Sequence, residues 1–582
     1  MVSKMLKQLI LARYSALFHS KWCIYFCATL CIYLSINQLA HSIDVYYDFS
    51  YNIFFRRWVE AGVFALPILF SKRKALTYSW LFLLGAYFLS IMWYFRTYAT
   101  IMPLSSYLMF NNADGLPSYI SGSFHAKDWW IILPLILLGI AVGYINRQES
   151  KNSSWKSGLI VTLLLGTLVS LPYWPNKRPD IKQPLFLYPL TSARGLKEYG
   201  IIHFWIYQIS KLHSLSPEEA KTVDDFFDKH HLLSYQIGHN QTEKNLILIL
   251  VESLQSWAIG LNHQGVSVTP NLDKLLLQDN TVYIRQMLSQ VKDGRSSDAQ
   301  LIINTGLLPL NTGAAASLCA DNLYPSLPHA LKIRGYHTAS LTCDDKDFWN
   351  QGRTSAAYGF DKLYAGLQNG YEKMYADSLL FDASIPILAK LPQPFYAQVV
   401  TFSMHMPYND LQNKNSRLLQ ASFTSDEVKN YLIAVELFDK RLGEFLNRLK
   451  QNGLYDESII VITGDHEQLT YNHYDGRSEC KVSDCLVPFI ILNSPLRTQH
   501  TDKVFGQTAI YPTLLHLMSC YNYSFKGLGE SIFADSVSNM AVYRTTEILY
   551  GPEYSPNDSI KNYQKDCWKI SDIILRMDYF RN

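Results

Sequence analysis

The chain has 582 residues, which is too many for one ordinary domain. Its formal net charge is only +3, so the charge gives no sign of a nucleic-acid-binding surface. Charged residues make up 17% of the chain and aromatic residues 14%, whereas soluble proteins carry roughly 25% charged residues. This composition indicates that part of the chain lies in a lipid bilayer.

Residues 1–175 contain five apolar stretches, and we predict that they form a five-helix transmembrane domain. A helix needs roughly 20 mostly apolar residues to cross the hydrocarbon core, and four stretches approach this length. The second is shorter and begins beside Arg56 and Arg57, so a hairpin lying on the membrane surface is the alternative for it. The stretches are Trp22–Ala40, Trp58–Phe70, Tyr78–Tyr94, Trp129–Ile145 and Ser157–Tyr173.

Basic residues in the loops predict how these helices are oriented. Clusters of Lys and Arg precede the first stretch and lie between the second and third and between the fourth and fifth. With five spans the three clusters fall on one side, which the positive-inside rule assigns to the cytoplasm. We therefore expect a multi-pass membrane protein, with residues 176–582 outside the cytoplasm.

After the membrane domain we expect a juxtamembrane linker over residues 176–240 and a catalytic domain over residues 241–582. In the linker, Ser216-Pro217-Glu218-Glu219 predicts the start of a helix that runs to about His231, because Ser can cap the helix and Pro suits its first turn.

From Asn245 onward, short apolar runs alternate with amphipathic stretches. Continuous apolar runs of this length fit strands that are buried on both faces. Strands that alternate with helices predict an α/β domain with a mostly parallel central sheet and helices on both faces. The predicted strands are Leu246–Val251, Thr338–Thr342, Tyr396–Phe402, Ile459–Thr463 and Pro488–Leu492, and the predicted helices include Pro270–Leu277, Tyr324–Arg334 and Ser425–Gln451.

Polar residues follow four of the predicted strands, and ligands of open α/β sheets bind beyond the carboxyl ends of the strands. A single acidic residue there is more often a helix cap, but four such positions together argue against that alternative. Carboxylates with imidazole bind a dication such as Mn²⁺, Mg²⁺ or Zn²⁺, which polarises a phosphoryl oxygen and helps to ionise a hydroxyl. We expect one divalent ion and leave a second open. The polar residues that follow the four predicted strands are Glu252, Asp344, Asp345, His405, Asp465 and His466.

The candidate nucleophile lies in the segment Asp293-Gly294-Arg295-Ser296-Ser297-Asp298. A glycine turn before an apolar run predicts the start of a helix, where backbone N–H groups favour a developing anion. A serine at this point can attack phosphorus if a metal lowers its pKa. The alternative is that Ser296 or Ser297 only caps the helix.

These motifs resemble the alkaline phosphatase/sulfatase superfamily. More closely, they resemble the lipoteichoic acid synthase group of membrane phosphoglycerol transferases and the related phosphoethanolamine transferases. The resemblance covers residues 245–520 and rests on Leu250–Leu254, Val268–Asp273, Gly294–Asp298, Phe348–Asn350, Ser403–Tyr408, Gly464–His466 and Tyr511–Leu515.

The resemblance implies a role for each of the matching polar residues. Ser296 matches the nucleophile, a position that most members of the family fill with threonine. His473 matches an active-site histidine that would protonate a leaving group. The positions that match metal ligands are Glu252, Ser296, Asp465 and His466, and those that match the lining of the phosphate site are Asp344, Trp349 and His405.

The chain departs from the teichoic acid synthases around its Phe-Trp-Asn block. Those enzymes typically have His-Gly before the block and Arg after it, where this chain has Thr342, Cys343 and Gln351. The missing Arg removes a bidentate phosphate clamp, and Arg353 is the nearby candidate to replace it.

Sulfatases oxidise a Cys or Ser that is followed by Pro and Arg at fixed positions, and Ser296 is followed by neither of them there. We therefore expect Ser296 to stay unmodified and the substrate to be a phosphodiester or phospholipid.

The predicted function is a metal-dependent phosphotransferase that moves a phosphoglycerol or phosphoethanolamine head group from a phospholipid donor. The acceptor is a glycan, a lipid or a teichoic-type polymer, and the covalent intermediate forms on Ser296. Two alternatives stay open. A phosphodiesterase, phosphatase or sulfatase-type hydrolase of the same fold shares every catalytic residue, and a catalytically inactive membrane-bound binding protein is the other alternative.

The nine cysteines fall into two groups. Cys23, Cys27 and Cys31 are spaced by four in the first apolar stretch, where small residues at a helix–helix contact are favoured over metal binding. The other six lie in the outer domain, and an even number outside the cytoplasm predicts disulfides, as phosphoethanolamine transferases have. The pairings that we expect are Cys319–Cys343, Cys480–Cys485 and Cys520–Cys567.

Overall fold

The computed structural model divides the chain into two compact units, Met1–Met102 with Ser118–Leu212, and Pro103–Pro117 with His213–Asn582. We describe each unit by itself. The described residues run from Lys21 to Arg581, except for residues 44–50, 72, 99–100, 103, 105–106, 108–124, 145–160, 162–163, 166–195, 197–199, 211–216, 234–242, 368–375, 407, 409–415, 469–470, 478–480, 521–522 and 545–546.

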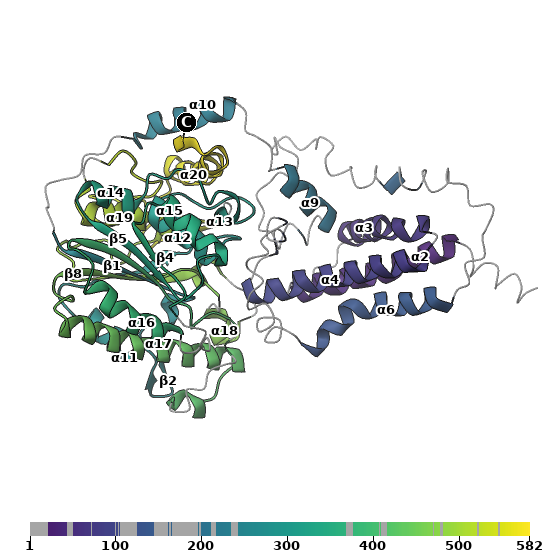
Figure 1. The fold of residues 1–582 in the computed structure, drawn as a ribbon, viewed down its shortest axis with the longest axis horizontal. Helices are drawn as coiled ribbons and strands as arrows, with labels where there is room; N and C mark the ends of the chain where they lie inside the picture. The colour runs from purple at the N-terminus through teal and green to yellow at the C-terminus, as the bar shows by residue number, and fades with distance from the viewer. Residues whose placement is uncertain are drawn as a thin grey trace, which may run out of the picture. The chain divides into compact units, whose positions relative to one another are not determined.

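The first unit is a group of mostly apolar helices (Figure 1). In the described part of the chain, three helices are long and apolar enough to cross a membrane, and they match the first, third and fourth predicted spans. The second predicted span lies in a helix, but that helix carries Arg56, Arg57 and Glu60 and is not one of the three. The fifth, Ser157–Tyr173, lies almost wholly outside the described residues. The helices are α2 (Lys21–Ile43), α3 (Tyr51–Phe70), α4 (Lys74–Tyr98), α6 (Trp129–Tyr144) and α9 (Ile201–Ser210).

Two buried carboxylates of this unit have hydrogen-bond donors, as apolar surroundings require. Arg96 on α4 makes two hydrogen bonds of 2.6 and 2.8 Å to the buried Asp128, just before α6. Glu60 on α3 accepts a 2.6 Å hydrogen bond from the backbone N–H of Ile202, at the start of α9. These contacts join helices that are far apart in the sequence.

The second unit is built on an eight-stranded sheet with the order β10-β4-β9-β8-β1-β7-β5-β6. All neighbouring strands are parallel except that β9 runs antiparallel to both β4 and β8. The five predicted strands are confirmed, and the mostly parallel α/β fold with them. The strands are β1 (Asn245–Val251), β4 (Val282–Leu288), β5 (His337–Thr342), β6 (Lys362–Tyr364), β7 (Phe395–Val400), β8 (Ser458–Gly464), β9 (Leu486–Leu492) and β10 (Phe505–Gly506).

Helices cover both faces of this sheet (Figure 1). Every residue of β1 and β8 is buried, so the two central strands form the middle of the core. One face is covered by α11 (Pro270–Leu276), α16 (Ala376–Leu388) and α17 (Asp426–Gln451). The other is covered by α12 (Ser296–Thr305), α14 (Leu327–Ile333), α15 (Gln351–Ala357) and α19 (Ile510–Leu517), with α20 (Asp558–Met577) farther out and α10 (Pro217–His230) packed on α20.

The structure contains no disulfide among the described cysteines, so the predicted pairs Cys319–Cys343 and Cys520–Cys567 are wrong. Cys480 lies outside the described residues, so the pair Cys480–Cys485 stays a prediction. The reason is burial among apolar residues. The Sγ of Cys343 lies 3.4 Å from the carbonyl oxygen of Ala376, and burial raises the pKa of the thiol well above its usual value. A protonated, inaccessible thiol is a poor partner for disulfide exchange.

We predict that Cys319, Cys343, Cys520 and Cys567 are thiols whether or not reductant is present, because each is buried without a disulfide partner. The full chain, denatured and alkylated without reductant, should carry the label on all four cysteines by peptide mass spectrometry. Labelling of any of the four only after reduction would show that it forms a disulfide.

Candidate active site

Three buried side chains meet at the carboxyl ends of β1 and β8. They belong to Glu252, Asp465 and His466, and each offers one ligand atom within 4.8 Å of the others. The Nε2 atom of His466 lies 3.5 Å from Oε1 of Glu252 and 3.5 Å from Oδ2 of Asp465. Because β1 and β8 are adjacent and parallel, their carboxyl ends bring these side chains to one point at the edge of the sheet.

The hydroxyl of Ser296 joins this cluster from the first residue of α12. Its Oγ donates a 3.1 Å hydrogen bond to Oε2 of Glu252 and lies 3.2 Å from Nε2 of His466. Ser297 instead donates to the carbonyl oxygen of Gly294, at 2.7 Å. The N-cap residue is Arg295, so neither serine has the capping role that we considered as an alternative, and Ser296 alone of the two faces the cluster.

Two glycines permit the close approaches that build the site. The carboxylate of Asp298 accepts 2.9 Å hydrogen bonds from the backbone N–H groups of Lys292 and Gly294, which closes the turn before Ser296. A Cβ atom on Gly294 would overlap this carboxylate, and a Cβ atom on Gly464, the residue before Asp465, would overlap the carbonyl oxygen of Leu254. Both positions therefore require glycine.

The charges of the cluster fit a divalent ion. Burial and the neighbouring charge of Glu252 raise the pKa of Asp465 well above its usual value, so the two carboxylates lack a compensating cation. Burial and the charge of Arg295 hold the pKa of His466 well below its usual value, which keeps the imidazole neutral, the form that binds a metal. Two carboxylates, a neutral imidazole and a hydroxyl form a suitable donor set, in which Glu252, Ser296, Asp465 and His466 would hold the ion.

Hydrogen bonds from neighbouring groups orient these side chains. Oδ1 of Asp465 accepts from the backbone N–H groups of Ser253 and His466, at 2.7 and 2.6 Å. Nδ1 of His466 lies 3.0 Å from Nη2 of Arg295 and 3.2 Å from the carbonyl oxygen of Glu467, and these two neighbours hold the ring with its Nε2 facing the cluster. The side-chain amide of Gln507 donates a 2.7 Å hydrogen bond to the carbonyl oxygen of Asp465.

An ionic network that sequence reasoning missed lies behind the cluster. Oε1 of the buried Glu467 accepts from Nη2 of Arg544 at 2.7 Å, from the hydroxyl of Tyr543 at 2.9 Å and from Nη1 of Arg295 at 3.3 Å. Burial raises the pKa of Glu467, but the charges of Arg544 and Arg295 outweigh it and lower the pKa overall. Glu467 thus holds the side chain of Arg295, the residue that precedes Ser296, in place. Its position directly after Asp465-His466 was the only sequence signal.

Two further predicted residues lie close to the cluster. Asp344 follows β5, where burial and the charge of Glu252 raise its pKa to about 7. His405 follows β7 and is 9% exposed, and its charge contributes to the lowered pKa of His466. Together with the cluster, these residues bring side chains from the ends of β1, β5, β7 and β8 into one region.

The structure places the remaining predicted residues farther along their loops. Trp349 and Asn350 both have positive φ angles, 47° and 53°, a conformation that costs free energy in a residue with a side chain. Arg353 forms an exposed ion pair with Asp321, so a phosphate would have to displace Asp321 to bind this guanidinium. His473 lies on the short helix α18 (Tyr471–Asp475) and is exposed.

We predict that Asp465→Ala removes bound metal because it takes one carboxylate from the donor set. The full chain purified in detergent should carry one equivalent of divalent ion by elemental analysis, and the variant should carry none. Asp502→Ala changes an exposed aspartate and is the matched control. Equal metal content in the two variants would contradict the assignment of Asp465.

We also predict that Arg544→Ala lowers turnover or metal affinity about 10–100-fold, the usual effect of removing a residue that orients a metal ligand. The reason is that Glu467 loses its 2.7 Å partner next to His466. Arg497→Ala, at an exposed arginine, should have no such effect. A loss of activity in Arg544→Ala that merely follows a lower unfolding temperature would argue for a structural role only.

Comparisons with known proteins show what this chain is similar to. A sequence model of the family described as Sulfatase matches residues 244–520. Lipoteichoic acid synthase 2 of Bacillus subtilis (strain 168) is 28% identical over 447 residues, which cover 72% of this chain and 67% of that protein. Lipoteichoic acid synthase of Staphylococcus aureus (strain USA300) is 26% identical over 576 residues, 90% of this chain and 88% of that protein. The crystal structure of the lipoteichoic acid synthase LtaP from Listeria monocytogenes has a TM-score of 0.49 at 25% identity and covers 61% of this chain and 98% of that one.

Proposed function

Residues 244–520 form a sulfatase domain of the alkaline phosphatase superfamily, homologous to lipoteichoic acid synthases, and from this membership we propose a membrane-anchored phosphotransferase. It would move a phosphoglycerol or phosphoethanolamine head group from a phospholipid to a glycan, a lipid or a teichoic-type polymer. Two relatives bear the name lipoteichoic acid synthase, which favours a teichoic-type polymer as the acceptor. The catalytic domain would lie outside the cytoplasm of a bacterial cell, held at its cytoplasmic membrane by the apolar helices.

One observation carries the proposal, the position of the Ser296 hydroxyl. It lies 3.1 Å from Glu252 and 3.2 Å from His466, and it begins a ten-residue helix whose N-terminus favours negative charge. A serine that only capped a helix would bond to backbone N–H groups instead. A hydroxyl held against a metal-type donor set is the arrangement that phosphoryl transfer through a covalent intermediate requires.

In the first step, the Oγ of Ser296 attacks the phosphorus of the lipid head group. The new Oγ–P bond forms as the P–O bond to diacylglycerol breaks. The proton of the hydroxyl passes to Oε2 of Glu252, the nearest carboxylate oxygen, and the diacylglycerol oxygen leaves with a proton from an acid, the role that we propose for His473. A divalent ion bound at the cluster would supply Lewis-acid polarisation of the phosphoryl oxygen.

In the second step, a hydroxyl of the acceptor attacks the same phosphorus and the P–Oγ bond breaks. The proton of the acceptor hydroxyl passes to His473, and the Oγ of Ser296 takes back the proton that Glu252 holds. Asp344, Trp349 and His405 would line the phosphate site. Gln351 is buried and neutral where the synthases carry a phosphate-binding Arg, so the substrate phosphate would be held without that clamp.

A hydrolase with water as the acceptor is the second candidate, because the same residues serve both reactions. The homology to synthases and the apolar helices favour transfer, because an enzyme anchored in a membrane would meet its phospholipid donor there. The distinction lies in what takes the head group in the second step.

We predict that Ser296→Ala abolishes release of diacylglycerol from a phospholipid labelled in its head group. The full chain in vesicles of phosphatidylglycerol or phosphatidylethanolamine should form a labelled protein adduct on Ser296 when the acceptor is absent, detected by peptide mass spectrometry. Adding acceptor should move the label onto it and clear the adduct.

Ser297→Ala is the matched control, because its hydroxyl bonds to the backbone and should leave the adduct intact. Label recovered only as free glycerol phosphate or phosphoethanolamine, whatever acceptor is supplied, would indicate a hydrolase. Unchanged diacylglycerol release in Ser296→Ala would refute the nucleophile.

A further inference from the structure

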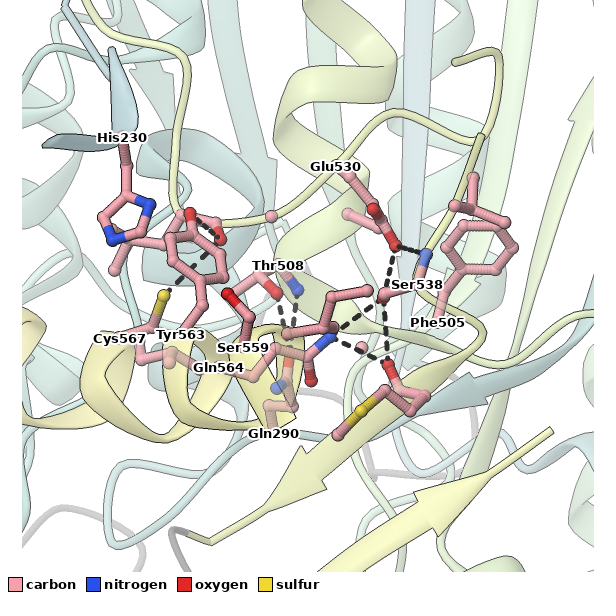
Figure 2. A pocket seen from close by; sticks show the side chains of 18 of the residues that line it. His230, Gln290, Phe505, Thr508, Glu530, Ser538, Ser559, Tyr563, Gln564 and Cys567 are labelled. Carbon is pink, nitrogen blue, oxygen red and sulfur yellow. Dashed lines mark hydrogen bonds between the residues drawn. The ribbon is translucent and has the colours of Figure 1, made fainter. Parts of the chain in front are cut away.

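A cavity of ≈ 480 Å³ lies in the catalytic unit apart from the cluster, and its volume falls within the range of about 300–1,000 Å³ that small-molecule sites occupy (Figure 2). Its walls come from segments far apart in the sequence. Gln290 follows β4, Thr508 follows β10, and residues 528–540 form a loop that faces α20. His230, at the end of α10, closes one side.

The cavity presents hydrogen-bond acceptors that the protein does not use. Oε1 of Glu530 accepts from the backbone N–H and the hydroxyl of Ser538, at 2.7 and 2.5 Å, but its Oε2 makes no hydrogen bond to a described residue (Figure 2). The side-chain amide of Gln564 donates 3.0 Å hydrogen bonds to Ser538 and Met540, and its Oε1 is free in the same sense. The hydroxyl of Ser559, also in the lining, is a third hydrogen-bonding group that a ligand could use.

The charge of the lining excludes an anionic ligand. Among its described residues there is no lysine or arginine, and Glu530 is the one carboxylate. The carboxylate of Glu530 already accepts two hydrogen bonds from Ser538, which offset its charge and make it a weak counter-charge for a cation. The chemistry that remains is a neutral ligand that donates hydrogen bonds.

Flat and apolar groups complete the walls. The ring of His230 packs against those of Phe226 and Tyr563, with centroids 4.6 Å away in both cases. Leu308 and Phe505 add aliphatic and aromatic surface. A sugar ring or a polyol has both features that such walls match, C–H faces for the apolar groups and hydroxyls for the acceptors.

We propose that this cavity binds a neutral, hydroxyl-rich group of the size of a sugar ring or short polyol, through hydrogen bonds to Glu530, Ser559 and Gln564. The site is separate from the metal-type cluster and differs from it in charge. Its existence does not depend on whether the chemistry at Ser296 is transfer or hydrolysis.

Short hydrogen-bonded links connect the cavity to the active site. The backbone N–H of Gln290 donates a 2.8 Å hydrogen bond to Oε1 of Gln507, whose Nε2 donates to the carbonyl oxygen of Asp465. In addition, β4 and β10 run parallel to β8, so the cavity begins at the same edge of the sheet as the cluster. A hydroxylated chain that occupied the cavity would therefore lie along the edge that carries Ser296.

The test measures sugar binding by the full chain in a detergent without sugar head groups, using saturation-transfer NMR with glucose, a glucose disaccharide and glycerol. Gln564→Leu removes the acceptor Oε1 and the two hydrogen bonds that the side-chain amide donates to Ser538 and Met540. Ser559→Trp fills the exposed mouth of the cavity without removing a buried hydrogen bond. Each should weaken binding about tenfold or more, the effect of losing about 1.4 kcal/mol. Lys569→Ala, at an exposed position on the same helix, should bind as the natural chain does.

Three outcomes would overturn the proposal. One is the absence of saturation transfer to every neutral probe. Another is binding that survives both substitutions in variants whose unfolding temperatures match that of the natural chain. The third is displacement of the sugars by ethanolamine, which would make the cavity a cation site. Should Gln564→Leu fail to fold, Ser559→Trp decides the result alone.

Discussion

The catalytic unit is organised around one electrostatic constraint, the burial of Glu252 and Asp465 side by side. They sit at the ends of adjacent strands whose register pairs Val251 with Gly464, so the backbone fixes their separation. Like charges at this distance are costly unless a cation or hydrogen bonds offset them. Two backbone N–H groups reach Asp465, and the imidazole of His466 stays neutral, which leaves the remaining charge for an ion to neutralise.

The sequence predicted the part of the site that follows from strand periodicity. Short apolar runs identified β1, β5, β7, β8 and β9, and the polar residues directly after β1, β5, β7 and β8 lie where the carboxyl ends of these parallel strands bring them together. The runs did not predict β4, because Arg285 and Gln286 interrupt its apolar run, nor β6 and β10, which have only three and two residues. Tyr543 and Arg544 follow no pattern that points to Glu467, since their role depends on tertiary packing.

Composition misled where it ignored burial. An even count of cysteines outside the membrane predicted disulfides, but Cys343 and Cys567 each contact a backbone carbonyl group within the core. Buried cysteine behaves as a small apolar residue, so its number says little about pairing. For the second apolar stretch the sequence was a better guide. Arg56 and Arg57 made it a doubtful membrane span, and in the structure α3 also carries Glu60, which accepts a hydrogen bond from the start of α9.

Positive charge near Ser296 comes from arginines behind the cluster. It does not come from Gln351, the position of the expected arginine clamp, or from Arg353. Gln351 is neutral, and Arg353 is engaged by Asp321 at the surface, whereas Arg295 and Arg544 are buried or nearly so and share Glu467. Charges held in this way need no reorganisation when a substrate arrives, and this property makes fixed charges effective in catalysis. Because Glu467 directly follows His466 and Arg295 directly precedes Ser296, one carboxylate aligns two catalytic segments that are about 170 residues apart in the chain.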